Sequence, residues 1–572
     1  MRKACISVLV ILLFLLTFAD VKYADSEMPI RFDGKDRFEV AVNVSKRGWP
    51  KAENVIIVNY LAFADALAAS PLAYKLNAPI LLTHPNKLTG ATKDEIKRLS
   101  PSKVSIIGGP GSVSGTVEKE LKDLGVSTER ITGEDRFEVA HNIAKKLGQT
   151  STVTLANGLK FPDALAIAPY AARKGYPILL TRENDLPAVT KKDITGKGKV
   201  IIVGGRGSVS DSIANQFSNK IRIDGKDRFE VSANVISTLN LSVDKAYIST
   251  GLSFADALTG SVMAAKDNAA LLLTSPNRLS SQTEQIIMEE DIEKFSFLGG
   301  NASISDSVAS YIMFHRPTDD PVVYFVPHAD DEVLTYAVDI RNAMKSNRPI
   351  YLVLLSKGED SGARDIQNGS YDEQSINSEL AGKPVYCWFH STYHDPVKEG
   401  YLHGHLSKEE FGDLRVDDFL RASKAMGVAS DHLFVDTIPN TSLSKDNVIE
   451  KMNVYINKFP NADFRTMSKD DAHPPHALLG RALEELELRG RINPYKTIYF
   501  VSMYTDRFSG KKLDIEKQHE EISDQSDHDY INRSIDEYKY FIPEEGIYAN
   551  GYHSVPSQFN TLSRNMYTSY YY

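Results

Sequence analysis

Short apolar runs alternate with longer amphipathic segments along residues 55–124. The continuous apolar runs at residues 55–59, 79–83 and 103–109 predict buried strands. The predicted helices span residues 65–76, 91–99 and 114–124. Continuous apolar strands separated by helices are typical of a parallel sheet covered on both faces. The pattern therefore predicts a small α/β domain.

The same pattern occurs in three copies, each marked by four blocks in the same order. The opening block, Gly-x-Asp-Arg-Phe-Glu-Val, starts at Gly34, Gly133 and Gly225. A Phe-x-Asp-Ala-Leu block, a Leu-Leu-Thr strand and a Gly-Gly pair follow it in every copy. Four ordered blocks in three copies indicate true internal repeats. We therefore predict three small parallel-sheet domains, at residues 30–125, 126–218 and 219–314.

These blocks resemble the cell wall-binding repeat type 2 family of Gram-positive surface proteins. The resemblance implies three domains that pack around one another and attach to an anionic wall polymer. It also associates the Leu-Leu segment with anchoring, which indicates Leu81, Leu82, Leu179, Leu180, Leu272 and Leu273. A core role for these leucines is the alternative, because such strands are commonly buried. Asp36-Arg37 and its equivalents could form structural charge pairs, or the Arg could hold polymer phosphate.

A second kind of domain begins after a polar linker at residues 315–321, and we place it at residues 321–572. The apolar strand at 322–326 leads into His328, Asp330, Asp331 and Glu332, and a predicted helix follows. His328 and Asp331 are residue types that bind a divalent metal such as zinc, and Asp330 would be left free beside them as a general base. For Glu332 we favour helix capping.

A catalytic zinc usually has three protein ligands, so a further ligand should follow downstream. His473 and His476 precede a predicted helix at 477–488 and are the best candidates. A rival cluster lies in what we read as an exposed loop. Its members are His390, His394, His403 and His405.

The motifs around His328 and His473 resemble those of the N-acetylglucosaminyl-phosphatidylinositol de-N-acetylase (PIG-L) family of zinc deacetylases, which implies a Rossmann-like α/β fold. The loop at Gly358-Glu359 and the helix containing Leu414-Arg415 resemble two further family motifs. The resemblance implies zinc binding by His328, Asp331 and His476, with Asp330 as base. It also implies that His473 stabilises the tetrahedral intermediate and that Arg415 contacts substrate.

The sequence departs from the PIG-L pattern at two positions. Asp418 stands where the family usually has Glu, and Pro475 replaces the Asp of His-Pro-Asp-His. The missing carboxylate would orient a neighbouring histidine, so Pro475 affects the efficiency expected of His473.

Two further segments have no assigned chemistry. Residues 364–406 form an insertion with the aromatic residues Trp388, Tyr393 and Tyr401, for which we favour packing over sugar binding. The Tyr-rich segment after Ile542 is expected to pack on the catalytic domain.

Composition, charge and cysteine content narrow the class of protein. The chain has 572 residues with 66 Lys+Arg against 75 Asp+Glu, a net charge of −9, which argues against a nucleic-acid binder. A basic start and the apolar run at residues 4–19 predict a secretory signal peptide within residues 1–24, with no membrane anchor after its removal. Cys5 lies in that segment, which leaves Cys387 without a disulfide partner or a second thiol for a Cys-rich zinc site.

Together these features predict a secreted, wall-attached, zinc-dependent N-deacetylase. Its expected substrate is an N-acetylated amino sugar of the N-acetylglucosamine type, and its expected wall partner is an anionic polymer. The alternative is a surface or adhesion protein whose hydrolase-like domain has lost catalysis and only binds glycan.

Overall fold

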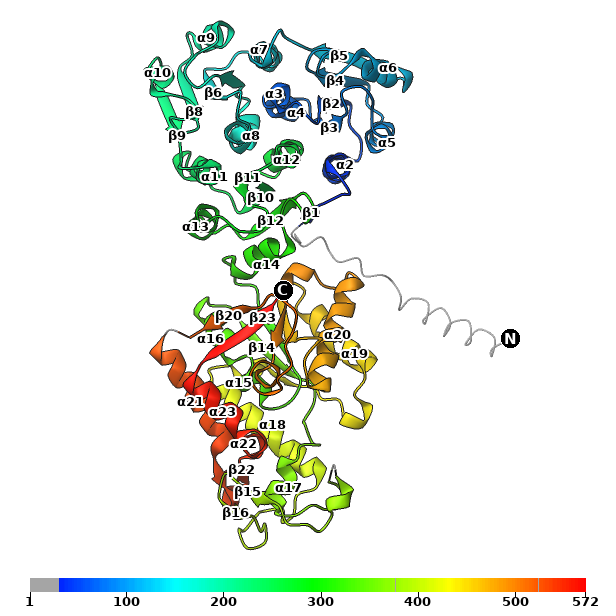
Figure 1. The fold of residues 1–572 in the computed structure, drawn as a ribbon, viewed down its shortest axis with the longest axis vertical. Coiled ribbons are helices and arrows are strands. Elements are labelled where there is room, and N and C mark those ends of the chain that lie inside the picture. The colour runs from blue at the N-terminus through cyan, green and yellow to red at the C-terminus, as the bar shows by residue number, and fades with distance from the viewer. Residues whose placement is uncertain (1–29, 376, 523) are drawn as a thin grey trace, which may run out of the picture. The chain divides into compact units, whose positions relative to one another are not determined.

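The computed structural model describes residues 30–375, 377–522 and 524–572 (Figure 1). The predicted signal peptide and Cys5 lie outside these residues. The chain divides into two compact units: the first comprises residues up to Ile286 together with Lys294–Ile304, and the second comprises Ile287–Glu293 and Ser305–Tyr572. Within the described part of the chain, no helix has the length and apolar character needed to cross a membrane.

The first unit contains three four-stranded parallel sheets, in agreement with the predicted α/β class. The first sheet has the order β3 (Ile80–Thr83), β2 (Asn54–Asn59), β4 (Lys103–Ile107), β5 (Ser127–Ile131). The second has the order β7 (Ile178–Thr181), β6 (Thr152–Asn157), β8 (Lys199–Val203), β9 (Lys220–Ile223). The third has the order β11 (Ala270–Thr274), β10 (Lys245–Thr250), β12 (Lys294–Leu298), β1 (Ile30–Phe32).

The fourth strand of each sheet comes from the segment that opens another copy of the repeat. β5 and β9 directly precede the Gly-x-Asp-Arg blocks at Gly133 and Gly225, yet each completes the sheet of the copy before it. β1 occupies the same position in the third sheet, where Arg31 pairs with Phe297 and Phe32 with Leu298. The three copies are therefore interlocked by exchanged strands.

The opening block of each copy forms the start of a helix. These helices are α2 (Arg37–Gly48), α7 (Arg136–Leu147) and α11 (Arg228–Thr238). The aspartates before them, Asp36, Asp135 and Asp227, are N-caps whose Oδ1 atoms accept two backbone N–H groups of the first turn. The cap explains the repeated Asp, because the first N–H groups of a helix have no intrahelical partner.

The block that follows lies at the centre of the first unit. Its phenylalanines contact one another, with ring centroids 5.7 Å apart for Phe63 and Phe161 and 5.8 Å apart for Phe63 and Phe254. The guanidinium of Arg136 lies 5.9 Å from the centroid of Phe63, so this Arg contacts the preceding copy. The central helices are α4 (Ala69–Lys75), α8 (Pro162–Lys174) and α12 (Ala255–Lys266) (Figure 1).

The remaining helices of the repeats are α3 (Phe63–Ala66), α5 (Gly90–Leu99), α6 (Gly115–Asp123), α9 (Ala188–Ile194), α10 (Asp211–Ala214) and α13 (Ser281–Glu289). The paired leucines of β3, β7 and β11 lie inside the sheets that these helices cover. Their side chains are therefore part of the core, which is the alternative stated for them from the sequence. All six are at most 1% exposed: Leu81, Leu82, Leu179, Leu180, Leu272 and Leu273.

The second unit is built on one seven-stranded sheet. Its order is β17 (Leu433–Val435), β14 (Ile350–Leu354), β13 (Val322–Val326), β18 (Asp463–Met467), β19 (Thr497–Val501), β23 (Tyr567–Tyr571), β20 (Gln518–Glu521). The first five strands are parallel, and β23 pairs antiparallel with both β19 and β20. β23 confirms that the Tyr-rich C-terminal segment packs on this unit.

Helices cover both faces of this sheet, which is why β13 is apolar throughout. Val322, Tyr324 and Val326 belong to one core, while Val323 and Phe325 belong to the core on the opposite face. The second core is closed by α19 (Lys445–Lys458) and α20 (Pro474–Leu488). The first is closed by α15 (Asp331–Leu334), α16 (Ala337–Lys345), α18 (Lys408–Ala425), α21 (Gln525–Lys539), α22 (Asn550–Ser554) and α23 (Pro556–Arg564).

Other elements of the second unit include α14 (Asp306–His315), α17 (Ala363–Asn368) and the hairpin of β15 (Tyr386–Cys387) and β16 (Thr392–Tyr393). This hairpin lies in the segment read from the sequence as an insertion. Of its aromatic residues, Tyr401 is buried, whereas Trp388 is 86% and Tyr393 is 55% exposed.

A buried charge cluster lies where β18 begins. Arg316 and Arg348 donate to Asp463 at 3.1 Å and 2.6 Å. Burial alone would raise the pKa of Asp463, but the surrounding guanidinium groups outweigh it and hold that pKa below its ordinary value.

Candidate active site and metal centre

The candidate site lies at the carboxyl ends of two adjacent parallel strands. β13 and β18 are paired, and the loops that follow them carry the predicted residues. The loop after β13 contains His328 and Asp330, and Asp331 is the first residue of α15, while the loop after β18 ends at His473, the N-cap of α20. Carboxyl ends of parallel strands meet at one sheet edge, and this is where open α/β sheets place their sites.

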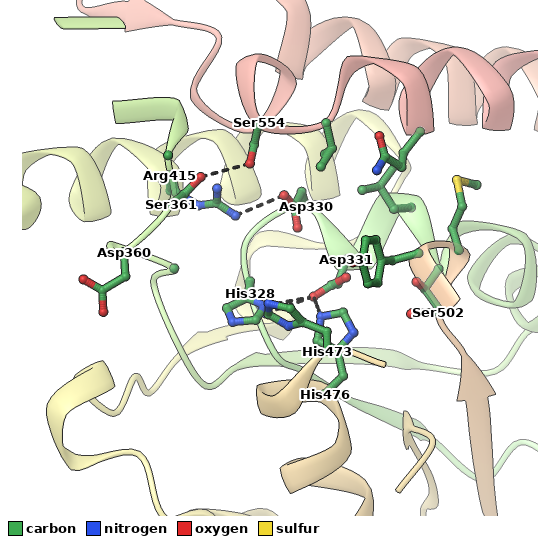
Figure 2. A pocket seen from close by; sticks show the side chains of 18 of the residues that line it. His328, Asp330, Asp331, Asp360, Ser361, Arg415, His473, His476, Ser502 and Ser554 are labelled. Atoms are coloured by element: carbon green, nitrogen blue, oxygen red, sulfur yellow. Dashed lines mark hydrogen bonds and ion pairs between the residues drawn. The ribbon is translucent and has the colours of Figure 1, made fainter. Parts of the chain in front are cut away.

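The structure brings the three predicted metal ligands together (Figure 2). Oδ2 of Asp331 lies 3.4 Å from Nδ1 of His328 and 3.1 Å from Nε2 of His476. One ligand atom from each of His328, His473 and His476 also lies within 4.8 Å of the others. His473 therefore borders the same centre.

The charges in this cluster are coupled. Burial opposes the charged forms, but attraction between the two side chains prevails, so the pKa of Asp331 is lowered and that of His476 is raised to about 10. Without a metal, a proton on His476 thus balances the Asp331 carboxylate.

Asp471 holds the other side of His476. Its Oδ1 lies 3.2 Å from Nδ1 of His476 and accepts the backbone N–H of His473 at 2.9 Å. Its Oδ2 accepts the backbone N–H of Ser502 at 3.2 Å. A carboxylate behind a ligating histidine fixes the ring and makes it a stronger ligand.

His473 differs from His476 in having no carboxylate of the described residues within ion-pair distance of its ring. Its Nδ1 is buried and has no hydrogen-bond partner among the described residues. Burial, together with His476 and His328, lowers the pKa of His473 to about 4, so its ring is neutral near neutral pH. Pro475 supplies no carboxylate at the position where the PIG-L pattern has Asp.

These residues fit a zinc ion. Two imidazoles and a carboxylate form a donor set common in catalytic zinc sites. The carboxylate of Asp471 behind His476 is a further feature of a metal centre. The predicted ligands are therefore compatible with zinc in position and in chemistry.

Asp330 lies beside this centre in a strained backbone conformation. Its φ is 136°, a region that residues other than glycine rarely adopt. Its carboxylate faces Arg415, whose Nη2 lies 3.1 Å from Oδ2. Burial raises the pKa of Asp330 well above its ordinary value, and Arg415 limits the rise.

Glu332 and Tyr538 hold the strained loop in place. Glu332 is completely buried and accepts the backbone N–H of Asp330 at 3.0 Å, which is the capping function that the sequence suggested. Tyr538 of α21 donates to the same carboxylate at 2.6 Å. The contact from α21 was not predictable, because no motif marks Tyr538.

Arg415 is a buried part of the site wall. It donates to the carbonyl oxygens of Ala329 and Lys357, in addition to Asp330. Gly358 makes this approach possible, since a Cβ there would lie 3.1 Å from Nε of Arg415, and its φ of 71° also favours glycine. The glycine loop and the Arg helix noted in the sequence are thus in direct contact.

A cavity of about 410 Å³ opens onto these residues. Its wall includes the predicted His328, Asp330, Asp331, Arg415, His473 and His476. Asp360 and Ser361, from the segment read as the glycine loop, also line it, and residues without a sequence signal complete it, among them Asn440, Tyr504, Ser554 and Gln558. The hydroxyl oxygens of Ser361 and Ser554 lie 2.9 Å apart, so the C-terminal helices form part of the wall.

The rival histidines do not reach this cavity. His403 and His405 are exposed, as expected for a loop. His394 is buried, contrary to that expectation, and forms a separate cluster with His390, Cys387 and His553.

Comparison with known families agrees with both halves of the chain. Residues 31–118, 130–214 and 222–309 match cell wall binding domain 2 (CWB2). Residues 323–486 match the GlcNAc-PI de-N-acetylase (PIG-L) family. Both resemblances noted in the sequence are therefore confirmed.

Curated relatives cover parts of the chain. The N-acetylmuramoyl-L-alanine amidase LytC of Bacillus subtilis (strain 168) is 36% identical over 321 residues, covering 56% of this chain and 64% of the relative. The amidase enhancer of the same organism is 41% identical over 281 residues, covering 49% of this chain and 39% of the relative. The chain thus spans less than two thirds of either relative. Among solved structures, Cwp8 from Clostridium difficile has a TM-score of 0.47 at 33% identity, covering 52% of this chain and 53% of that one.

Proposed function

We propose that this chain, three cell wall binding repeats followed by a PIG-L domain, is a secreted, wall-attached, zinc-dependent N-deacetylase of N-acetylated amino sugars. One observation carries the proposal. The donor atoms of His328, Asp331 and His476 converge beside the carboxylate of Asp330 at a cavity of about 410 Å³. The PIG-L match of residues 323–486 supports the same reaction class.

His328, Asp331 and His476 would hold the zinc ion. When bound, the ion supplies Lewis acidity that lowers the pKa of water and polarises the amide carbonyl. Asp330 would accept a proton from the attacking water and return it to the amine nitrogen as the C–N bond breaks. The products are acetate and a free amino sugar.

His473 and Arg415 would assist from the cavity wall. His473 would donate its single N–H to the carbonyl oxygen as negative charge develops there. Arg415 would keep Asp330 in position through the contact of 3.1 Å, and its place in the wall leaves it available for the substrate contact suggested by the family.

The repeats would attach the enzyme to an anionic polymer of a Gram-positive cell wall. Tethering raises the local concentration of a polymeric substrate without any new contact at the active site. The test is co-sedimentation of the mature chain with purified walls. Release at high salt would indicate electrostatic attachment through Lys and Arg, whereas retention would contradict a purely ionic interaction.

Acetate release tests the enzymatic proposal directly. The mature chain loaded with zinc is incubated with N-acetylglucosamine oligomers and wall-derived glycans, and acetate is measured. Wild-type protein should release acetate, and the Asp330→Asn variant should not. Stoichiometric zinc without acetate from any of these glycans would contradict the proposal.

One observation favours the alternative, a protein that binds glycan without turning it over. Nδ1 of His473 has no partner among the described residues, and Pro475 stands where an orienting carboxylate was expected. Glycan binding by the wild type without acetate release would support that alternative.

A further inference from the structure

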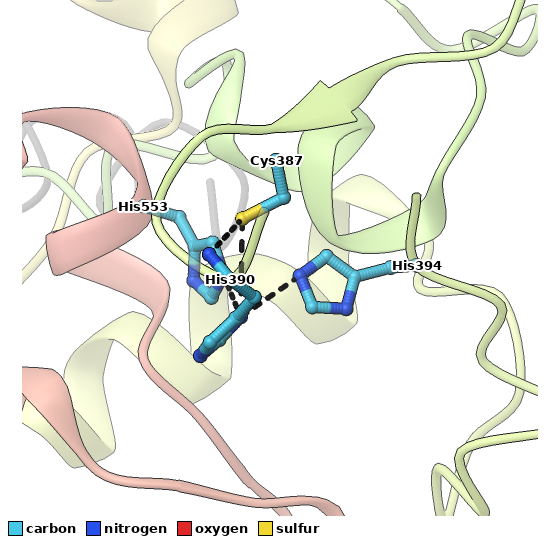
Figure 3. Close-up of side chains that lie close together, drawn as sticks. All are labelled: Cys387, His390, His394 and His553. Atoms are coloured by element: carbon cyan, nitrogen blue, oxygen red, sulfur yellow. Dashed lines mark hydrogen bonds between the residues drawn. The ribbon is translucent and has the colours of Figure 1, made fainter. Parts of the chain in front are cut away.

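Figure 3 shows a second cluster of metal-binding side chains in this unit. Cys387, His390, His394 and His553 each contribute one ligand atom, and these atoms all lie within 4.8 Å of one another. Cys387, His394 and His553 are at most 5% exposed. None of the four residues lines the cavity described above.

Three of the ligands come from the hairpin of β15 and β16. Cys387 is on β15, His390 is in the turn, and His394 directly follows β16. The backbone N–H of His390 donates to Sγ of Cys387 at 3.3 Å, which fixes the turn and sets the two side chains together. His553 comes from α22, so two distant segments of the chain meet here.

The three distances from Nδ1 of His390 to the other donor atoms are close to the edges of a zinc tetrahedron. Nδ1 of His390 lies 3.1 Å from Nε2 of His394, 3.3 Å from Nε2 of His553 and 3.8 Å from Sγ of Cys387. Usual Zn–N and Zn–S bond lengths give tetrahedral edges of about 3.4 Å between nitrogens and about 3.6 Å between nitrogen and sulfur.

The surrounding hydrogen bonds direct lone pairs toward the same point. Nδ1 of His394 lies 3.0 Å from both carboxylate oxygens of Glu399, and Nδ1 of His553 lies 2.8 Å from the carbonyl oxygen of Ala549. Both acceptors require an N–H at Nδ1, so each neutral ring presents a lone pair at Nε2. A hydrogen on Nδ1 of His390 can form a good hydrogen bond to only one of these two Nε2 atoms. A metal ion can instead be coordinated by all the donor atoms at once. A carboxylate or carbonyl behind a ligating histidine is the usual outer support of a metal site, and His394 and His553 both have one.

We propose that Cys387, His390, His394 and His553 bind a zinc ion at a second, structural site. Four protein ligands close the coordination shell, which is the arrangement of structural rather than catalytic zinc. The site requires only one thiol, so the absence of a second cysteine partner is no obstacle. The ion would tie the hairpin to α22, the helix that also contributes Ser554 to the cavity wall.

Metal content tests the stoichiometry. The mature full-length chain, purified without chelators, should contain two zinc ions. The Cys387→Ser/His553→Ala variant should contain one, and its thermal midpoint should fall. His403→Ala and His405→Ala are matched controls from the same segment, both exposed, and should keep two ions. A Cys387→Ser/His553→Ala protein with the wild-type zinc content would overturn the proposal.

Cobalt substitution separates the two sites and does not depend on that variant folding. Only the second site has a thiolate, so cobalt-loaded wild type should show a sulfur-to-cobalt charge-transfer band. The band should persist in His328→Ala/His476→Ala, where the deacetylase centre is removed, and disappear in Cys387→Ser. A cobalt-saturated wild type without this band would overturn the second site while leaving the proposed deacetylase untouched.

Discussion

Oδ1 of Asp471 lies 3.2 Å from Nδ1 of His476, opposite the ring nitrogen that faces Asp331. His476 is thus held between two carboxylates. One belongs to the candidate ligand set, and the other comes from the loop between β18 and α20. Asp471 supports His476 in this way, although the expected carboxylate of the His-x-x-His motif is replaced by Pro475.

The first prediction concerns this support. Asp471→Asn should weaken zinc binding by about 10- to 100-fold, because an amide orients the ring less firmly and lowers its basicity. Competition with a chromogenic chelator measures the affinity. Asp470→Asn, an exposed neighbour, is the matched control and should bind as the wild type does. Equal affinity in both variants would show that Asp471 does not support a ligand.

The second prediction concerns Asp330. Asp330→Asn should reduce the rate of acetate release by about 10²- to 10⁴-fold, because the amide cannot accept the proton. Zinc content should remain close to that of the wild type, since Asp330 is not among the proposed ligands. A variant with wild-type turnover would exclude Asp330 as the base, whereas loss of zinc would assign it to the metal centre.

The third prediction concerns the buried charge cluster at the start of β18. Asp463→Asn leaves Arg316 and Arg348 buried without their charge partner, and this should lower the free energy of unfolding by about 3–5 kcal/mol near neutral pH. Urea unfolding of the full chain measures the difference. Asp319→Asn, an exposed substitution nearby, should leave the free energy unchanged.

The same cluster predicts a pH dependence. The folded pKa of Asp463 lies below the unfolded value of about 3.9, so its stabilisation is complete above that pH and is lost as the pH falls toward the folded pKa. The difference in free energy of unfolding between wild type and Asp463→Asn should therefore become smaller below about pH 4. A gap that widens on acidification would contradict the assignment.

The fourth prediction concerns the helix caps of the repeats. Asp135 accepts the N–H groups of Phe137 and Glu138 at 2.9 Å and 3.0 Å. Asp135→Ala should lower the free energy of unfolding by about 1 kcal/mol and speed hydrogen exchange at those amides, while Asp135→Ser should retain most of the stability. Equal exchange in wild type and Asp135→Ala would show that the cap contributes nothing.

The sequence predicted what periodicity and local motifs encode. The strand at 322–326 and the His-containing loop after it follow from an apolar run that ends in polar residues, and the structure places them at a sheet edge as expected. The boundaries between the repeats were harder to predict. β5 directly precedes the opening block of the second copy, but it joins the sheet of the first copy. Local pattern does not show which sheet such a strand joins.

Long-range partners were beyond the reach of the sequence. Tyr538 and His553 contact residues that are more than 150 positions away in the chain, and neither belongs to a recognisable motif. Asp471 is close to His476 in the chain, but it too belongs to no recognisable motif. The spacing of Cys387, His390 and His394 was a usable signal for a metal, but its fourth member is far away in the chain. Packing, rather than local preference, assembles these sets.

The pairing of β1 with β12 gives the repeat array a fixed copy number. In an open solenoid every copy offers its neighbour the same edge, so copies can be added or lost with little change at the others. Here the strand that opens the first copy completes the sheet of the third, and no copy is left with an unfilled fourth position. Deleting or duplicating one copy would break the contacts of Phe63, Phe161 and Phe254 at the centre. Evolutionary change in this unit should therefore proceed by substitution within three copies or by replacement of the whole unit.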